Sequence, residues 1–173
     1  MSTKSRKDII VIPDERLRQK SQRVGFIDES IHKLAEDMLA ASLDWEAHRD
    51  HETCAALAAV QIGVLERVVI VRDNMEDLDD KSFSVFINPE IVKELGEPEE
   101  KWEGCLSVDS IYGHVPRYPK VKVKALNLEG KEVRLTATGF LAQAFQHEID
   151  HTNGIVFIDR VTDPTKLRKI AAN

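Results

Sequence analysis

The chain has 173 residues, of which 42% are hydrophobic and 31% are charged, and its formal net charge is −6. This length is typical of one ordinary domain with a buried core, so we predict a single domain over residues 1–173. The negative charge argues against a general affinity for nucleic acid or anionic membranes, and no apolar run approaches the roughly 18 residues of a membrane span.

The amino-terminal segment lacks the pattern of a secretory signal, because its apolar run Ile9–Ile12 is short and is broken by Pro13. We therefore expect a cytoplasmic protein, and an organellar location after removal of a presequence stays open. Without secretion, the two cysteines, Cys54 and Cys105, are not expected to form a disulfide. One of them is therefore available as a metal ligand.

The first predicted element is a helix. Apolar residues recur at helical spacing from Ile31 to Leu43, after Asp28, whose side chain can cap a helix. This pattern predicts an amphipathic helix over about Ser30–Ala47. The β-branched run Val68–Val71 then predicts a buried strand.

Further strands and a second helix follow. Strands are predicted at Ser84–Ile87 and Val121–Leu126, and a hairpin turn at Glu129-Gly130 leads into Lys131–Thr136. A helix over about Phe140–His151 begins after Thr138-Gly139 and ends before Asn153-Gly154.

The second predicted helix carries the segment His147-Glu148-Ile149-Asp150-His151. Positions i and i+4 of a helix lie on one face, so both histidines can bind one divalent metal ion, with Glu148 in reach of a water on the metal. This is the arrangement of a metal-dependent hydrolase. The order of the predicted elements, a helix, then strands, then a helix, indicates an α+β fold, which we predict to have largely antiparallel sheets packed around a central metal-binding helix near the C-terminus.

A catalytic site of this kind needs a third protein ligand and an open position for water. Some metalloproteases take that ligand from the last histidine of HExxHxxGxxH, but Phe157 stands at this position. The downstream acids Asp159 and Asp163 lie on no obvious continuation of a helix. Upstream, Cys105 follows Gly104, which allows a close approach of the backbone, and could bind as a thiolate. Cys105 is thus the better candidate, and an HExxH-type peptidase stays an alternative.

Three segments of the chain together resemble the peptide deformylase family. Glu103–Ser107 reads EGCLS and matches the second motif of the family, and His147–His151 matches the third, HExDH. Cys54–Gln61 corresponds to the first motif, GxGLAAxQ. Ile12–Arg18 and Asn88–Ile91 are also similar to family segments, so the resemblance covers nearly the whole chain.

The first motif departs from the family pattern, because Cys54 and Ala56 replace its two glycines. In the family this strand edge approaches the metal and binds the substrate backbone. A methyl group at Ala56 could narrow the cleft, and it would be strained if the local φ were positive. We expect Cys54 to be a packed thiol and not a ligand. A deformylase-like protein with altered or no catalytic activity therefore stays a second alternative.

The resemblance also implies the roles of the site residues. Three of them would hold the metal through one thiolate and two imidazoles: Cys105, His147 and His151. Glu148 would move a proton, while the Gln61 side-chain amide and the Leu106 backbone N–H would donate to the oxyanion. Apart from the resemblance, Glu103 is either a surface acid or, as its place near Cys105 in the chain favours, a residue that orients a neighbour of the metal. Asp150 is expected to cap, pair or solvate the helix end and receives no catalytic role. Three residues would contact the substrate backbone: Ala55, Ala56 and Gly104.

The resemblance implies hydrolysis of the N-terminal formyl group from formyl-methionine of nascent peptides, with release of formate. The ligand types allow Fe²⁺, Zn²⁺, Ni²⁺ or Co²⁺, and the resemblance favours Fe²⁺. Transient contact with the ribosome is expected, with neither direct nucleic-acid specificity nor membrane association. Three basic residues, predicted to lie on a helix end, could help this contact: Lys166, Arg168 and Lys169.

Overall fold

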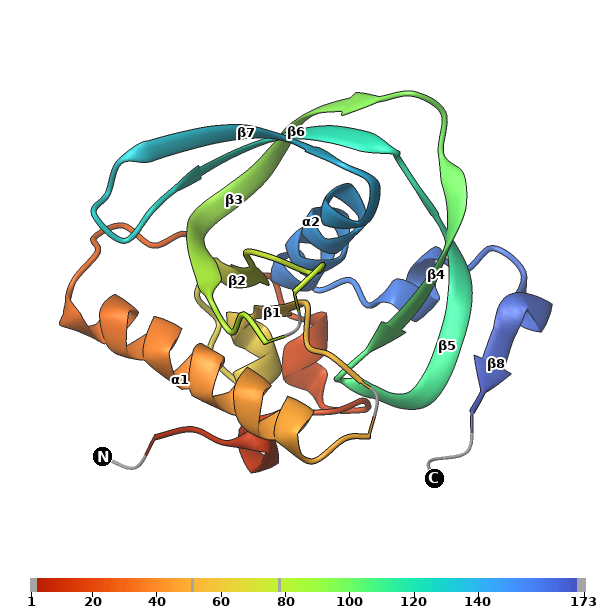
Figure 1. The fold of residues 1–173 in the computed structure, drawn as a ribbon, viewed down its shortest axis with the longest axis horizontal. Helices are drawn as coiled ribbons and strands as arrows, with labels where there is room; N and C mark the ends of the chain where they lie inside the picture. Colours follow the sequence, from red (N-terminus) through yellow and green to blue (C-terminus); the bar gives the residue numbers. More distant parts are fainter. Residues whose placement is uncertain (1–2, 51, 78, 171–173) are drawn as a thin grey trace.

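The computed structural model describes residues 3–50, 52–77 and 79–170. Over this part of the chain it contains two α-helices and two antiparallel sheets (Figure 1). Helix α1 spans Glu29–Ala47 and helix α2 spans Gly139–Thr152. The sheets enclose α2, and the predicted α+β class with antiparallel sheets around a helix near the C-terminus is confirmed.

The larger sheet has five strands in the order β1-β2-β3-β6-β7. Its strands have these bounds: β1 Ala56–Ala58, β2 Val68–Arg72, β3 Phe83–Leu95, β6 Lys120–Leu126 and β7 Glu132–Thr138. The smaller sheet has the order β4-β5-β8 and these bounds: β4 Glu99–Cys105, β5 Val108–Arg117 and β8 Leu167–Lys169. Short 3₁₀ helices occupy these positions: Arg6–Asp8, Glu15–Arg18, Ala59–Ile62, Phe157–Arg160 and Pro164–Lys166.

Helix α1 forms where the sequence predicts it. The Asp28 side chain accepts the Ser30 backbone N–H at 2.9 Å and so satisfies one of the free donors at the helix start. Residues at a spacing of three or four, among them Ile31, Leu34 and Met38, are buried on one face. That face packs on β1 and β2.

Strand β2 separates two parts of the hydrophobic core. Val69 and Val71 pack toward α2, while Val68 and Ile70 pack toward α1, because successive side chains of a strand point to opposite faces. Every residue of β2 is buried, which confirms the predicted buried strand.

Helix α2 lies in the middle of the molecule, under the arch of β3, β6 and β7, with β4 and β5 beside it (Figure 1). It ends close to the prediction, at Thr152, and Gly154 follows with a φ of 76°. A Cβ at Gly154 would lie 2.6 Å from the backbone oxygen of Arg18, so this close approach needs glycine as much as the positive φ does. The chain thereby turns sharply behind the helix that carries the histidines.

Strand β3 is longer than the predicted Ser84–Ile87. Its ladder is interrupted after Ile87 by a β-bulge, and Asn88 adopts a φ of 52° there. The Asn88 side chain accepts the Val24 N–H and donates to the Val24 carbonyl oxygen, both at 2.9 Å. This side-chain pairing with a distant segment holds a strained residue within a strand.

Strands β4 and β5 were not among the predicted elements. Strand β4 reads EEKWEGC and is rich in glutamate, which has a low strand propensity. Its first two residues, Glu99 and Glu100, are exposed. It becomes a strand because it pairs with β5 from Glu99↔Arg117 to Cys105↔Val108. The smaller sheet thus depends on tertiary pairing and not on local preference.

The prediction of a helix end at the C-terminal basic residues was wrong. Lys166 closes a single 3₁₀ turn, and Arg168 and Lys169 belong to β8, which pairs with β5. The free edge of β5 offers hydrogen bonds that a short isolated helix cannot match.

In the described part of the chain, no helix is long and apolar enough to cross a membrane.

Replacement of Phe145 by alanine should lower the free energy of unfolding by about 3–5 kcal/mol, because it removes a large buried ring and leaves a cavity. Phe145 is fully buried, and its ring lies edge-on to Phe86 with centroids 4.9 Å apart. Urea unfolding measures the change. Phe140→Ala, on the same helix but half exposed, is the control and should change stability by less than about 1 kcal/mol. Equal effects of the two substitutions would contradict this view of the core.

Candidate metal centre and active site

Two elements bring the three predicted metal ligands together. Cys105 is the last residue of β4, directly before the two-residue turn Leu106–Ser107 that leads into β5. His147 and His151 lie one turn apart on α2. The potential ligand atoms of these three residues all lie within 4.8 Å of one another, and Cys105 Sγ is 3.2 Å from His151 Nε2.

This donor set fits a divalent transition metal. One sulfur and two ring nitrogens suit such ions, and three protein donors leave a coordination position open. Burial lowers the pKa of His151, and the positive charges of His147 and Arg117 lower it further, so its ring is neutral as a ligand must be. Burial also lowers the pKa of His147, but hydrogen bonds with Cys105 and Glu103 outweigh it and leave this pKa raised. Metal binding would therefore release a proton from this cluster.

Glu103 orients one of the two histidine rings. Its Oε2 lies 2.9 Å from Nδ1 of His147, which leaves Nε2 for a metal. Burial raises the pKa of the Glu103 carboxyl, but hydrogen bonds with His147 and Arg117 outweigh it and lower this pKa to about 2. The carboxylate is thus ionised beside the ring, in the arrangement expected from its place two residues before Cys105.

Arg117 is the main residue that the sequence did not reveal. It is only 3% exposed, and its guanidinium donates to Glu103 at 2.7 Å and to Asp150 at 2.6 Å. Asp150 also accepts from Arg160 at 2.6 Å. Sequence alone gave no signal for this network, because Arg117 lies on a strand that was not predicted and is far from both acids in the chain.

Glu148 lies beside the two histidines with its carboxyl group buried. It is 4% exposed, and its Oε2 has no hydrogen-bond partner in the described part of the chain. Burial raises the pKa of this carboxyl to about 7, and the nearby charge of Glu103 adds to the effect against that of His147. An unpartnered carboxyl group in this position can exchange a proton with a molecule bound in the site.

The Gln61 side chain has a fixed orientation. Its Oε1 accepts the Ala58 backbone N–H at 2.9 Å, and its Nε2 donates to Ser107 Oγ at 3.2 Å. The same Nε2 lies 3.6 Å from Cys105 Sγ. The amide N–H groups therefore point toward the cluster of potential metal ligands.

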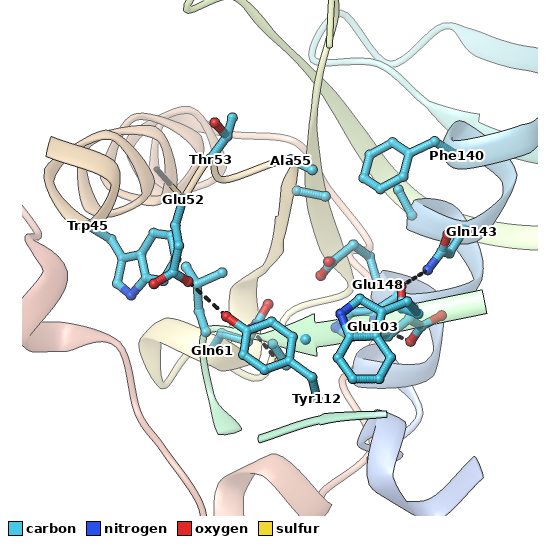
Figure 2. A pocket seen from close by; sticks show the side chains of 17 residues that line it. Trp45, Glu52, Thr53, Ala55, Gln61, Glu103, Tyr112, Phe140, Gln143 and Glu148 are labelled. Carbon is cyan, nitrogen blue, oxygen red and sulfur yellow. Dashed lines mark hydrogen bonds and ion pairs between the residues drawn. The ribbon is translucent and has the colours of Figure 1, made fainter. Parts of the chain in front are cut away.

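A cleft of about 270 Å³ opens beside this cluster (Figure 2). The predicted site residues line this cleft, with the exception of His151, whose side chain is buried. The lining also contains four aromatic residues that the sequence analysis did not assign to the site: Trp45, Trp102, Tyr112 and Phe140. In Figure 2, Trp45 lies on one side of the cleft and Phe140 on the other, with Glu148 between them.

The two residues in place of glycines cause no backbone strain. Among the described residues, the non-glycine positions with positive φ are Asn88 and Ser110, so neither Cys54 nor Ala56 has a positive φ. Cys54 is fully buried, and its thiol donates to the Ala56 carbonyl oxygen at 3.4 Å. Burial raises the pKa of this thiol, which keeps it protonated. Cys54 is packed and does not belong to the ligand cluster.

Comparison with known proteins places this geometry in a family. The sequence model of the family described as Polypeptide deformylase matches residues 6–167. The chain belongs to this family. A peptide deformylase of Thermomicrobium roseum is 45% identical over 165 residues, which are 94% of this chain and 89% of the relative.

Solved deformylase structures agree with the fold as well. A peptide deformylase from Legionella pneumophila superimposes with a TM-score of 0.81 at 40% identity, over 95% of this chain and 89% of that one. The enzyme from Synechococcus elongatus, in complex with actinonin, gives a TM-score of 0.82 at 33% identity, over 91% of this chain and 82% of that one. The chain is thus a metal-dependent hydrolase of the deformylase family, and neither the peptidase nor the inactive alternative is favoured.

Glu103→Ala should weaken metal binding about 10–100-fold, because His147 loses the acceptor that orients its ring. Competition with a chelator, with the variant shown to be folded by circular dichroism, measures the affinity. Glu99→Ala, at the exposed start of the same strand, is the matched control and should bind metal like the wild type. A folded Glu103→Ala variant with unchanged affinity would contradict the orienting role.

Proposed function

We propose that this chain removes the N-terminal formyl group from formyl-methionine of nascent peptides and releases formate. The observation that carries the proposal is the convergence of Cys105, His147 and His151 with Glu148 and Gln61 in one cleft, in a chain of the deformylase family. We also take residues 1–173 to act as one catalytic domain.

A divalent ion would be held by three residues: Cys105, His147 and His151. When bound, such an ion lowers the pKa of a water molecule and polarises the formyl carbonyl group. We expect Fe²⁺ in this position, while Zn²⁺, Ni²⁺ and Co²⁺ are compatible with the same ligands. The preference for Fe²⁺ rests on membership of the deformylase family, because the ligand types alone allow all four ions.

Glu148 moves the proton in this proposal. Its unpartnered oxygen takes a proton as water attacks the formyl carbon, and it returns that proton to the departing amine. The C–N bond of the formamide breaks, and formate and a free N-terminal methionine are the products. Glu148 directly follows the metal ligand His147 in the chain, so its carboxyl group lies close to the place where the formyl carbon would react.

Two donors stabilise the negative charge that develops on the formyl oxygen. They are the Gln61 amide, held by Ala58 and Ser107, and the Leu106 backbone N–H. The peptide lies along the backbone of two cleft walls, Ala55 and Ala56 on one side and Gly104 on the other. Donors fixed before the reaction avoid the cost of reorienting them in the transition state.

The partners follow from the substrate. Formylated nascent chains emerge from the ribosome, so the enzyme meets it transiently, and we expect this in the cytoplasm. Three basic residues near the C-terminus could contribute to the encounter: Lys166, Arg168 and Lys169. Of these, Lys166 already pairs with Glu100 at 2.6 Å. We expect no sequence-specific contact with nucleic acid.

Glu148→Ala should keep its metal but lose about 10²–10⁴-fold in kcat on a formyl-Met tripeptide, because the proton acceptor is gone. The assay is made anaerobically with metal content measured in the same sample. Glu129→Ala, in the exposed β6–β7 turn, is the control and should match the wild type. A wild type that is fully metallated but inactive on every formyl peptide would contradict the proposed function.

Activity of the Fe²⁺-loaded enzyme should fade in air and persist under anaerobic conditions, because oxygen attacks both the ion and the Cys105 thiolate. Substitution with Ni²⁺ should give activity that lasts in air. The measurement is residual turnover against time for each metal, with and without oxygen. Equal and stable activity with every metal in air would rule out the expected Fe²⁺ preference.

A further inference from the structure

The chain that leads into β1 is held by two charged side chains from other elements. The Cys54 backbone N–H donates to Oε2 of Glu46 at 3.0 Å, and the Cys54 carbonyl oxygen accepts from Nε of Arg72 at 3.1 Å. The backbone N–H of Arg72 also donates to the Ala55 carbonyl oxygen at 2.8 Å. Glu46 lies at the end of α1 and Arg72 at the end of β2.

Glu46 and Arg72 form a buried ion pair with each other. The Arg72 side chain is completely buried and the Glu46 side chain is 12% exposed. Arg72 makes a further hydrogen bond to the Asp80 carbonyl oxygen at 2.8 Å, and Lys81 pairs with Glu46 from the solvent side. Burial raises the pKa of the Glu46 carboxyl, but hydrogen bonds from Lys81 and from the Cys54 N–H outweigh it and leave this pKa lowered. The carboxylate is therefore ionised at neutral pH.

This pair stands directly behind one wall of the cleft. Ala55 and Ala56, the next residues after Cys54, line the cleft, whereas neither Glu46 nor Arg72 does. Strand β1 pairs with β2 over only Ala56–Ala58 and is the outermost strand of its sheet. Before Ala56, the chain is held by the side chains of Glu46 and Arg72, which bond to Cys54, and by one backbone bond from Arg72 to Ala55. A displacement of this edge would change the width of the cleft without moving the ligands on β4 and α2.

We propose that the Glu46–Arg72 ion pair is a positioning pair, which holds the Ala55–Ala56 edge at the spacing that a bound peptide needs. The inference rests on the proposed function, since the peptide in question is the formylated substrate. The pair thus acts on substrate binding and not on the chemical step.

The first test separates binding from chemistry. Glu46→Gln removes the charge but keeps an oxygen that can accept the Cys54 N–H, so this variant should fold. Arg72→Lys keeps the charge but loses the planar guanidinium that reaches Glu46, Cys54 and Asp80 together. Both should raise KM for a formyl-Met tripeptide at least fivefold, with kcat and metal content within twofold of the wild type. Lys81→Met, which removes only the exposed partner of Glu46, is the control and should leave KM within twofold.

The second test does not depend on catalysis. Amide hydrogen exchange of the peptide that contains residues 54–58 should be at least fivefold faster in Glu46→Gln than in Lys81→Met, while exchange in α2 stays the same. If the wild type fails to deformylate, the proposed function falls, but this exchange result still tests the positioning of the edge.

Two outcomes would overturn the inference. In one, KM and the exchange of residues 54–58 in both pair variants equal those of Lys81→Met. In the other, kcat, metal content and melting temperature fall together with the rise in KM, which would show that the pair supports only the fold.

Discussion

Arg117 is buried between two carboxylates that lie on different elements, Glu103 on β4 and Asp150 on α2. Burial of these charges is costly, and removal of one partner from such a network typically costs about 3–5 kcal/mol, because it leaves a charge unpaired. Glu103 stands two residues before Cys105, and Asp150 directly precedes His151. The same contacts that satisfy the buried charges therefore fix β4, which carries Cys105, against α2, which carries both histidines.

The other features of the site follow from this junction. Once β4 and α2 are fixed against each other, Glu103 meets the His147 ring and the turn after Cys105 brings Ser107 to Gln61. The metal ligands then need no flexible loop to assemble, which keeps their geometry defined before an ion binds. The opposite wall of the cleft belongs to a different sheet, and its position is set separately, by Glu46 and Arg72.

The two residues that stand in place of family glycines, Cys54 and Ala56, fit into the wall that Glu46 and Arg72 hold without a positive φ. Ala56 adopts an ordinary negative φ and packs in the core between β2 and α2, so its methyl group is accommodated mainly inside the protein. The Cys54 thiol likewise points inward and bonds to the Ala56 carbonyl oxygen. Both side chains are therefore used for packing, and neither competes with Cys105 for a metal.

The elements with local signals could be predicted before the structure was known. Helical spacing predicted α1 and α2, a β-branched run predicted β2, and the i, i+4 spacing predicted that His147 and His151 share one face, since each signal depends on residues close together in the chain. The distant ligand Cys105 was joined to them by the resemblance of the EGCLS segment to a family motif. Two other features depend on contacts between distant parts of the chain: the strand character of β4 and the position of Arg117. The first depends on pairing with β5, which outweighs the low strand propensity of its glutamates. The second depends on burial among charges from distant segments, and no local pattern in a sequence records such partners.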